Sequence, residues 1–170
     1  MPQGDIKVSV KLHGADKLTK AFRTSPKWLG QEIERGLENS ALSVQREAQI
    51  LAPVDTGRLR GSITYELDKA PIPKFAKVGP TVEYGAFVEF GRRPNSAMPP
   101  VSALIPWLKR QGVSQNTESV AFLVARSIAK RGIKPKPYMR DGYKEAKRGI
   151  DKIWGKVARS IEMRWGRTNA

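Results

Sequence analysis

The sequence contains no cysteine and only one histidine, His13, in 170 residues. The absence of cysteine excludes a disulfide scaffold, a thiolate metal site and a cysteine nucleophile. A lone histidine has no second imidazole with which to hold a metal, and we expect His13 to be a solvated surface residue. The glycines are dispersed, and none forms a phosphate loop between a strand and a helix. We therefore expect no metal, no cofactor and no catalytic residue.

Long hydrophobic runs are absent as well. No segment approaches the length of about 18 apolar residues that a membrane span needs. The first residues, MPQGDIKVSVKLHG, carry charge at Asp5 and Lys7 and lack the apolar run of a signal peptide. We expect a protein without a membrane partner, which is kept soluble in a cytoplasm or released by lysis.

Positive charge is abundant and unevenly distributed. Residues 1–125 hold 17 Lys and Arg against 12 Asp and Glu, a balance of +5, whereas residues 126–170 hold 14 against 4, a balance of +10. The last quarter of the chain is therefore a basic segment. A positive field of this kind favours polyanions or acidic protein partners, although it says nothing about the fold.

Helical periodicity is strongest between residues 26 and 51. Apolar residues recur there at spacings of three and four, which predicts an amphipathic helix about 39 Å long. Pro53 disfavours helical geometry at the residue before it, so we expect the helix to end at that point. A shorter helix is expected earlier in the chain, through Leu18 and Phe22.

Three segments have the character of strands. Residues 6–12 alternate apolar and polar side chains, and residues 62–68 and 74–79 are predicted to form two strands joined by a loop rather than a tight hairpin. Residues 81–91 suit either a helix or a strand. The sequence therefore predicts an α+β fold, in which the long helix packs on a small, mainly antiparallel sheet and further helices follow toward the C-terminus.

The second half of the chain is predicted to be helical. Residues 100–112 form a short helix bent or interrupted by Pro106, and a second helix is capped by Thr117. Prolines make residues 131–139 an extended connector rather than a central strand. A long amphipathic helix follows over about 138–165.

The tripeptide Asp55-Thr56-Gly57 raises the question of catalysis, because aspartic proteases carry their catalytic carboxylate in this tripeptide. Such a site needs two carboxylates that share a proton in an apolar surrounding. A second subunit could supply another carboxylate, but Arg58 and Arg60 follow closely and favour an ionised Asp55. In the alternative interpretation, Asp and Thr oxygens accept backbone N–H groups and glycine permits a positive φ. The segment is then a helix end, a capped turn and a strand entry.

The C-terminal helix carries a row of basic residues roughly opposite its apolar stripe. They are either a solvated helix face or a contact with a polyanion, whose phosphates would release counterions on binding. No DNA or RNA motif accompanies them, so we expect no sequence-specific recognition. The residues are Arg140, Lys144, Lys147, Arg148, Lys152, Lys156 and Arg159.

Four segments occur in a distinctive order. A long helix ending in AQILAPVDTGRLRGSI is followed by VGPTVEYGAFVEFG, by a loop with AMPP, and by KPKPYMRDGYKEA before the last helix. This order resembles the head-tail joining or tail completion proteins of tailed bacteriophages, with their P-x-D-T-G-x-L-R-x-S turn, Y-x-x-x-V-E-F-G segment and P-[YF] step. The matching positions are Pro53, Asp55, Thr56, Gly57, Leu59, Arg60, Ser62, Tyr84, Val88, Glu89, Phe90, Gly91, Pro137 and Tyr138.

The resemblance implies a non-enzymatic structural protein of the virion neck or tail, assembled in the host cytoplasm. Family members form a ring, expected here to be a hexamer, between the head connector or stopper and the tail terminator or tail tube, and the genome passes through the centre. The turn residues implied are Pro53, Asp55, Thr56, Gly57, Leu59, Arg60 and Ser62. The residues implied at a subunit interface are Tyr84, Val88, Glu89, Phe90, Gly91, Pro137 and Tyr138.

Compared with the short family pattern, the chain has a helical insertion at about 100–134. We expect a single domain over residues 1–170, with a basic C-terminal helix at about 138–165. Two other functions stay open. One is a small non-specific nucleic-acid-binding protein that uses the basic helix, and the other is a tail terminator or another minor tail protein. Non-specific contact with genomic DNA is compatible with the ring as well.

Overall fold

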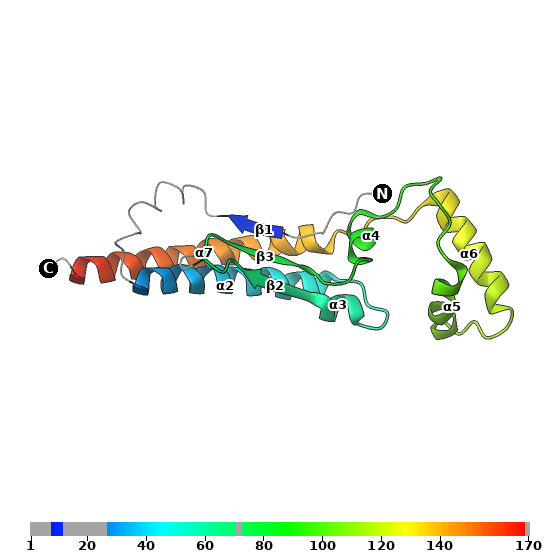
Figure 1. Cartoon of the computed structure of the whole chain (residues 1–170), viewed down its shortest axis with the longest axis horizontal. Coiled ribbons are helices and arrows are strands. Elements are labelled where there is room, and N and C mark those ends of the chain that lie inside the picture. Colours follow the sequence, from blue (N-terminus) through cyan, green and yellow to red (C-terminus); the bar gives the residue numbers. More distant parts are fainter. Residues whose placement is uncertain (1–7, 12–26, 71–72, 169–170) are drawn as a thin grey trace. The chain divides into compact units, whose positions relative to one another are not determined.

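The computed structural model describes residues 8–11, 27–70 and 73–168 (Figure 1). The expected helix through Leu18 and Phe22, and His13, lie outside these residues. The chain forms two compact units, one made of Met1–Gly85 with Pro137–Ala170 and the other of Ala86–Lys136. A compact unit is not by itself a domain, so the single domain stays a prediction.

The first unit is built around two long helices, α2 (Lys27–Leu51) and α7 (Tyr138–Thr168). They run side by side in opposite directions (Figure 1). The rings of Trp28 and Trp165 meet edge to face at one end, with centroids 6.2 Å apart. At the other end Gly142 lies against the backbone of Ala48. The predicted helix over residues 26–51 is confirmed, and so is the long C-terminal helix.

Small residues bring the two helices close together. A Cβ atom at Gly142 would lie 2.6 Å from the backbone nitrogen of Ala48, and one at Gly36 would lie 3.0 Å from a methyl group of Val157. Side chains of ordinary size at these two positions would hold the helices further apart. The buried residues of α2 are Leu29, Gly30, Ile33, Gly36, Leu37, Ser40, Ala41, Val44 and Ala48. They include every apolar residue of the predicted stripe except Leu51, which is exposed.

A three-stranded sheet lies along this helix pair. Its strands are β1 (Val8–Lys11), β2 (Ile63–Leu67) and β3 (Phe75–Pro80), in the order β1-β3-β2 with both pairings antiparallel. Ile63, Ala76 and Val78 are buried, whereas Glu66 and Lys77 on the other face are exposed. A sheet with one buried face shows this alternation. The α+β fold with a mainly antiparallel sheet is therefore confirmed.

Two short helices lie next to the strands; the sequence missed the first and left the second open. The first, α3 (Arg58–Ser62), lies between the end of α2 and the start of β2, where the sequence predicted a turn leading directly into a strand. A helix of five residues is too short to show a periodic pattern, which explains the error. The second, α4 (Gly85–Phe90), resolves the ambiguous segment 81–91 in favour of a helix.

The second unit contains α5 (Val101–Arg110) and α6 (Thr117–Arg131), which confirms the two helices predicted for residues 100–134. Pro106 lies inside α5, as expected. The predicted cap of α6 is one residue out of place, because Asn116 is the N-cap residue and Thr117 is the first helical residue. None of the helices among residues 27–70 and 73–168 is long and apolar enough to cross a membrane.

We predict that Gly142→Ala destabilises the protein by about 1 to 3 kcal/mol, because the added methyl group overlaps the backbone of Ala48. The measurement is urea denaturation followed by circular dichroism. Gly155→Ala in the same helix is the matched control, since a Cβ there meets nothing within 4 Å. It should stabilise the protein by about 0.5 to 1 kcal/mol. Equal effects of the two substitutions would contradict the close helix contact.

A second prediction concerns the Tyr65 hydroxyl of β2, which donates a hydrogen bond of 2.9 Å to Glu38 Oε1 of α2. This bond, together with burial, raises the pKa of Tyr65 above its ordinary value of about 10. Tyr65→Phe should lower the free energy of unfolding by about 1 kcal/mol at neutral pH.

The pH dependence of this difference follows from the raised pKa. The stabilisation is fully present below about pH 10 and is lost as the pH rises through the raised pKa of the folded state. Urea denaturation at neutral and alkaline pH measures it. Tyr143→Phe, at an exposed tyrosine, is the control and should change stability by less than about 0.5 kcal/mol. A difference for Tyr65→Phe that persists at high pH would disagree with this hydrogen bond.

Candidate functional site

The Asp55-Thr56-Gly57 segment forms the corner between α2 and α3. The α2 helix ends with a hydrogen bond from the Ala52 amide to the Ala48 carbonyl, 2.9 Å long. Gly57 is the N-cap residue of α3 and has a left-handed backbone with φ 79°. Glycine adopts this conformation at little cost. The Arg58 amide donates to Thr56 Oγ1 at 3.4 Å, which is a long bond.

Leu59 and Ser62 fasten this corner to the rest of the first unit. Leu59 is buried, and the Ser62 hydroxyl donates a hydrogen bond of 2.7 Å to the Leu59 carbonyl. The Thr81 amide, just after β3, donates to the Ser62 carbonyl at 3.0 Å. Of the other turn residues, Pro53 is half-buried and Arg60 is exposed. The corner thus connects the end of α2 to the start of β2 and, through the Thr81 amide, to the end of β3.

Asp55 does not have the surroundings of a protease carboxylate. It is exposed to solvent, whereas a catalytic pair needs an apolar surrounding that keeps one acid protonated. Within the described part of the chain, His, Asp and Glu form no group of three or more that could hold a metal ion. The corner has the geometry of a structural element.

A second glycine-dependent element lies in the second unit, where two distant parts of the chain pass each other. The amides of Arg92 and Ile133 each donate to the other's carbonyl at 2.9 Å. Gly91 and Gly132, beside them, have φ values of 71° and 74°. A Cβ at Gly91 would overlap the Ile133 carbonyl oxygen, and one at Gly132 would overlap that of Arg92. We call these four residues the crossing.

The residues implied at a subunit interface differ widely in exposure. Phe90 is 71% exposed and Tyr84 is 41% exposed, whereas Tyr138 is 2% exposed and Glu89 is 4% exposed. Val88, Gly91 and Pro137 are half-buried. Tyr84 and Phe90 therefore present aromatic surface, while Tyr138 belongs to the core of the first unit. Their role at an interface stays a prediction.

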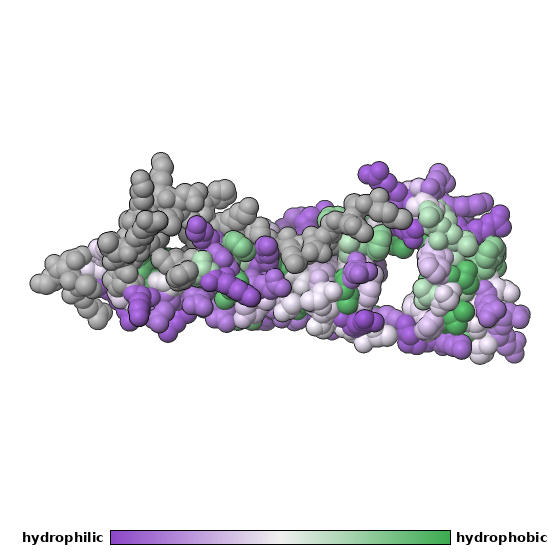
Figure 2. Space-filling view, in the orientation of Figure 1, coloured by the Kyte–Doolittle hydropathy of each residue, from purple (hydrophilic) through white to green (hydrophobic). Residues whose placement is uncertain are grey.

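Further exposed apolar side chains lie in the second unit, and sequence analysis did not single them out. Figure 2 shows hydrophobic surface over α5 and α6. These helices are short and bury few large side chains in each other, so their apolar residues stay at the surface. The aromatic content of this unit is about the same as that of the whole chain, so composition gave no signal. The residues are Phe87, Met98, Trp107, Phe122, Leu123 and Ile133.

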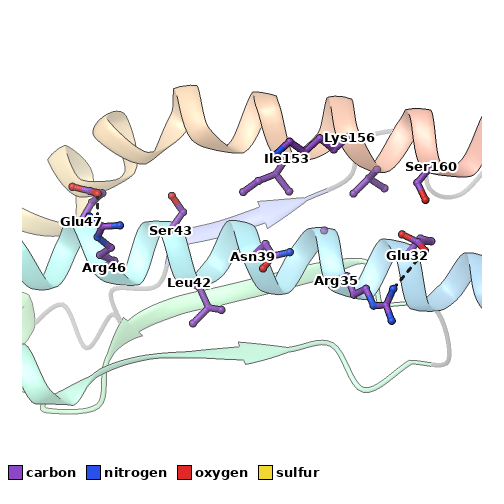
Figure 3. Close-up of a pocket in the computed structure, with 12 residues that line it drawn as sticks. Glu32, Arg35, Asn39, Leu42, Ser43, Arg46, Glu47, Ile153, Lys156 and Ser160 are labelled. Atoms are coloured by element: carbon purple, nitrogen blue, oxygen red, sulfur yellow. Dashed lines mark ion pairs between the residues drawn. The ribbon is translucent and has the colours of Figure 1, made fainter.

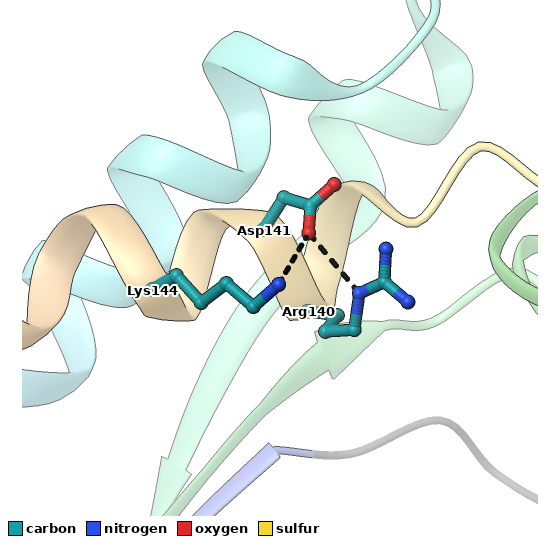
Figure 4. A network of polar contacts seen from close by, with 3 residues as sticks. All are labelled: Arg140, Asp141 and Lys144. Carbon is teal, nitrogen blue, oxygen red and sulfur yellow. Dashed lines mark hydrogen bonds and ion pairs between the residues drawn. The ribbon is translucent and has the colours of Figure 1, made fainter.

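The seven basic residues predicted on the C-terminal helix all lie on α7 and are all exposed. Three of them pair with acids of the same helix. Arg140 Nε and Lys144 Nζ lie 3.1 and 3.5 Å from Asp141 Oδ1 (Figure 4), and Lys147 Nζ lies 3.2 Å from an oxygen of Asp151. The hydrogen bond from Arg140 lowers the pKa of Asp141 below its ordinary value.

An open groove of about 630 Å³ runs between α2 and α7 (Figure 3). Glu32 of its lining is paired with Arg35 at 3.6 Å and with Arg164 at 3.1 Å, and Glu47 lies 3.9 Å from Arg46. Because these charges are paired within the chain, the groove offers no converging set of free acids and bases. It is the surface furrow between two helices, with Lys156 at its α7 side.

The sequence of this chain is similar to a known phage protein family. Residues 16–91 match the family described as "Bacteriophage HK97-gp10, putative tail-component". The matched segment is 76 of the 170 residues and includes α2, α3, the β2–β3 pair and α4. No curated protein matches the chain, and no solved structure matches it.

We predict that Gly91→Ala destabilises the crossing. The substitution forces a side chain into the left-handed region, at a cost of about 1 to 2 kcal/mol, and adds the overlap with Ile133. Gly112→Ala is the matched control, because Gly112 also has a positive φ, 87°, but its Cβ would meet nothing within 4 Å. Amide hydrogen exchange at Arg92 and Ile133 should accelerate in Gly91→Ala alone. Equal acceleration in both variants would show that backbone strain, not the crossing, sets the stability.

Proposed function

We propose that this protein is a structural component of a tailed phage virion that joins the head connector or stopper to the tail. It assembles as a ring, expected to have six subunits, in contact with the tail terminator or tail tube, and the genome passes through the ring. It acts by protein-protein contact and catalyses no reaction. Its place is the neck or tail of the virion, after assembly in the host cytoplasm.

One observation carries the proposal, the match of residues 16–91 to the phage tail-component family. The matched segment contains the PVDTGRLRGS corner and the YGAFVEFG helix, two of the motifs that carry the sequence resemblance. The corner at Asp55 has a structural geometry, and its carboxylate is exposed. Both points agree with an assembly role.

The exposed aromatic residues support assembly with other subunits. Large apolar side chains that stay at the surface in number are typical of protein-protein interfaces. Phe90 is the most exposed of them, and it belongs to the family segment. Within the proposal, Phe90 and Tyr84 contribute to the contact between neighbouring subunits of the ring.

Deletion of the gene from the phage that encodes this protein tests the joining role. Electron microscopy of lysates should show filled heads and finished tails that are separate. Complementation with the wild-type gene should restore joined virions. Tails of irregular length would instead indicate a tail terminator, and normal virions would exclude both roles.

The ring itself is tested on purified protein by light scattering. Phe90→Ser should raise the protein concentration needed for oligomer assembly at least tenfold, because it removes apolar surface from the proposed contact. Met163→Ser is the control, since Met163 is 59% exposed but lies outside the family segment. A wild-type protein that is monomeric at every concentration would contradict the ring.

A further inference from the structure

We propose that four residues of α7, Arg148, Lys152, Lys156 and Arg159, form a binding surface for the phosphate backbone of duplex DNA. We call these four residues the basic stripe. The inference goes beyond the joining role, since it assigns a ligand to one face of one helix. Only the choice of DNA over other polyanions rests on the proposed function.

The four basic side chains lie on one face of α7. A helix turns about 100° per residue, so the four side chains leave α7 within an arc of about 80°. Ala146 and Ile150, which are buried, leave the helix on the opposite side. All four basic residues are exposed. The stripe is therefore a continuous face that points away from the core of the first unit.

Ion pairs distinguish the stripe from other basic residues of the helix. Arg140, Lys144 and Lys147 each lie within ion-pair distance of an acid on α7 itself. Arg148, Lys152, Lys156 and Arg159 make no ion pair with any described residue. Asp151 and Glu162 of α7 project outside its arc, whereas Glu145, three residues before Arg148, lies within the arc at one end of the stripe. The four basic residues outnumber this acid, so the face keeps an excess of positive charge for an external partner.

The spacing of the stripe is compatible with a phosphate backbone. Residues four apart on a helix are separated by about 6 Å along its axis. Phosphates on one strand of B-form DNA rise by about 3.4 Å each along the duplex axis while they wind around it. The four cations follow one another at intervals of four, four and three residues over about 16 Å, so they can meet several phosphates of a strand that runs along this face. Acidic protein surfaces have no such regular repeat of charge.

Other basic residues do not form a comparable face. Arg126, Lys130, Arg131 and Lys134 are equally exposed, and they are also two arginines and two lysines. Arg131 leaves α6 about 100° from its neighbour Lys130, and Lys134 lies beyond the end of the helix. This set is the matched control, because it carries the same charge and residue types without the alignment.

The experiment is fluorescence anisotropy of a labelled 30-base-pair duplex with the purified full-length protein, over a range of salt. Each phosphate neutralised contributes about 0.9 to the slope of log affinity against log salt, so four contribute about 3.6. The part of the affinity that comes from neutralising these four phosphates falls about 150-fold between 50 and 200 mM salt. Replacing all four stripe residues with glutamine should remove this slope and weaken binding at 50 mM salt at least tenfold.

The control variant, with glutamine at positions 126, 130, 131 and 134, should keep most of the slope. If the fourfold stripe variant fails to fold by circular dichroism, the pairs Arg148→Gln with Lys152→Gln and Lys156→Gln with Arg159→Gln replace it. Each pair should lower the slope by about 1.8.

Two results would overturn the proposal. One is equal loss of DNA binding in the stripe and control variants, which would assign binding to net charge. The other is the absence of DNA binding by the wild-type protein at 50 mM salt. If the stripe variant then still blocked virion assembly, the partner of the stripe would be an acidic protein. Because the assay uses purified protein and DNA, it can fail while the joining role, tested by gene deletion, stands.

Discussion

The close contact between α2 and α7 is the constraint on which the first unit depends. Gly142 lies against the Ala48 backbone, and Gly36 lies against Val157. Because small residues occur where the helices approach, the two axes stay close over a long distance, and each helix then offers one face to the other. The residues of α2 that are not used by α7 pack on β2 and β3, so the sheet has a continuous apolar support. Without this contact neither long helix would bury enough surface, since an isolated helix gains little stability from its own hydrogen bonds.

The same arrangement decides where charge is available. Several acidic residues of the helix pair form ion pairs within the chain: Glu32 pairs with Arg35 and Arg164, and Asp141 pairs with Arg140 and Lys144. These surface pairs contribute little to stability, because exposed ion pairs are screened by solvent. Their consequence is electrostatic: they cancel the charge of some basic residues of α7, and the four residues of the stripe keep theirs on one face of the helix.

The sequence was sufficient for elements that bury a long periodic stripe. Apolar residues at spacings of three and four predicted α2, because burial of one helix face imposes a period on many residues at once, and residues 62–68 were predicted as the strand that became β2. The sequence did not predict elements whose structure depends on only a few contacts. The α3 helix depends on the backbone of Gly57 and on the Ser62 hydroxyl, and the crossing joins Arg92 to Ile133, 41 positions apart, through backbone groups. Backbone contacts between distant segments have no side-chain pattern. Likewise, the sequence singled out seven of the basic residues of α7, but only the structure separates the three of them that have acidic partners from the four of the stripe.

The motif residues of the family segment divide into two groups with different physical explanations. Leu59 is buried, Gly57 has a left-handed backbone, and Gly91 closes the crossing, so each is required by the fold of its own unit. No such requirement exists for Phe90, because a side chain with most of its surface in water gains little from folding. Burial of an exposed aromatic ring becomes favourable only when another surface covers it. Gly91 and the crossing hold the neighbouring Phe90 within its own unit, where its ring stays open to a covering surface.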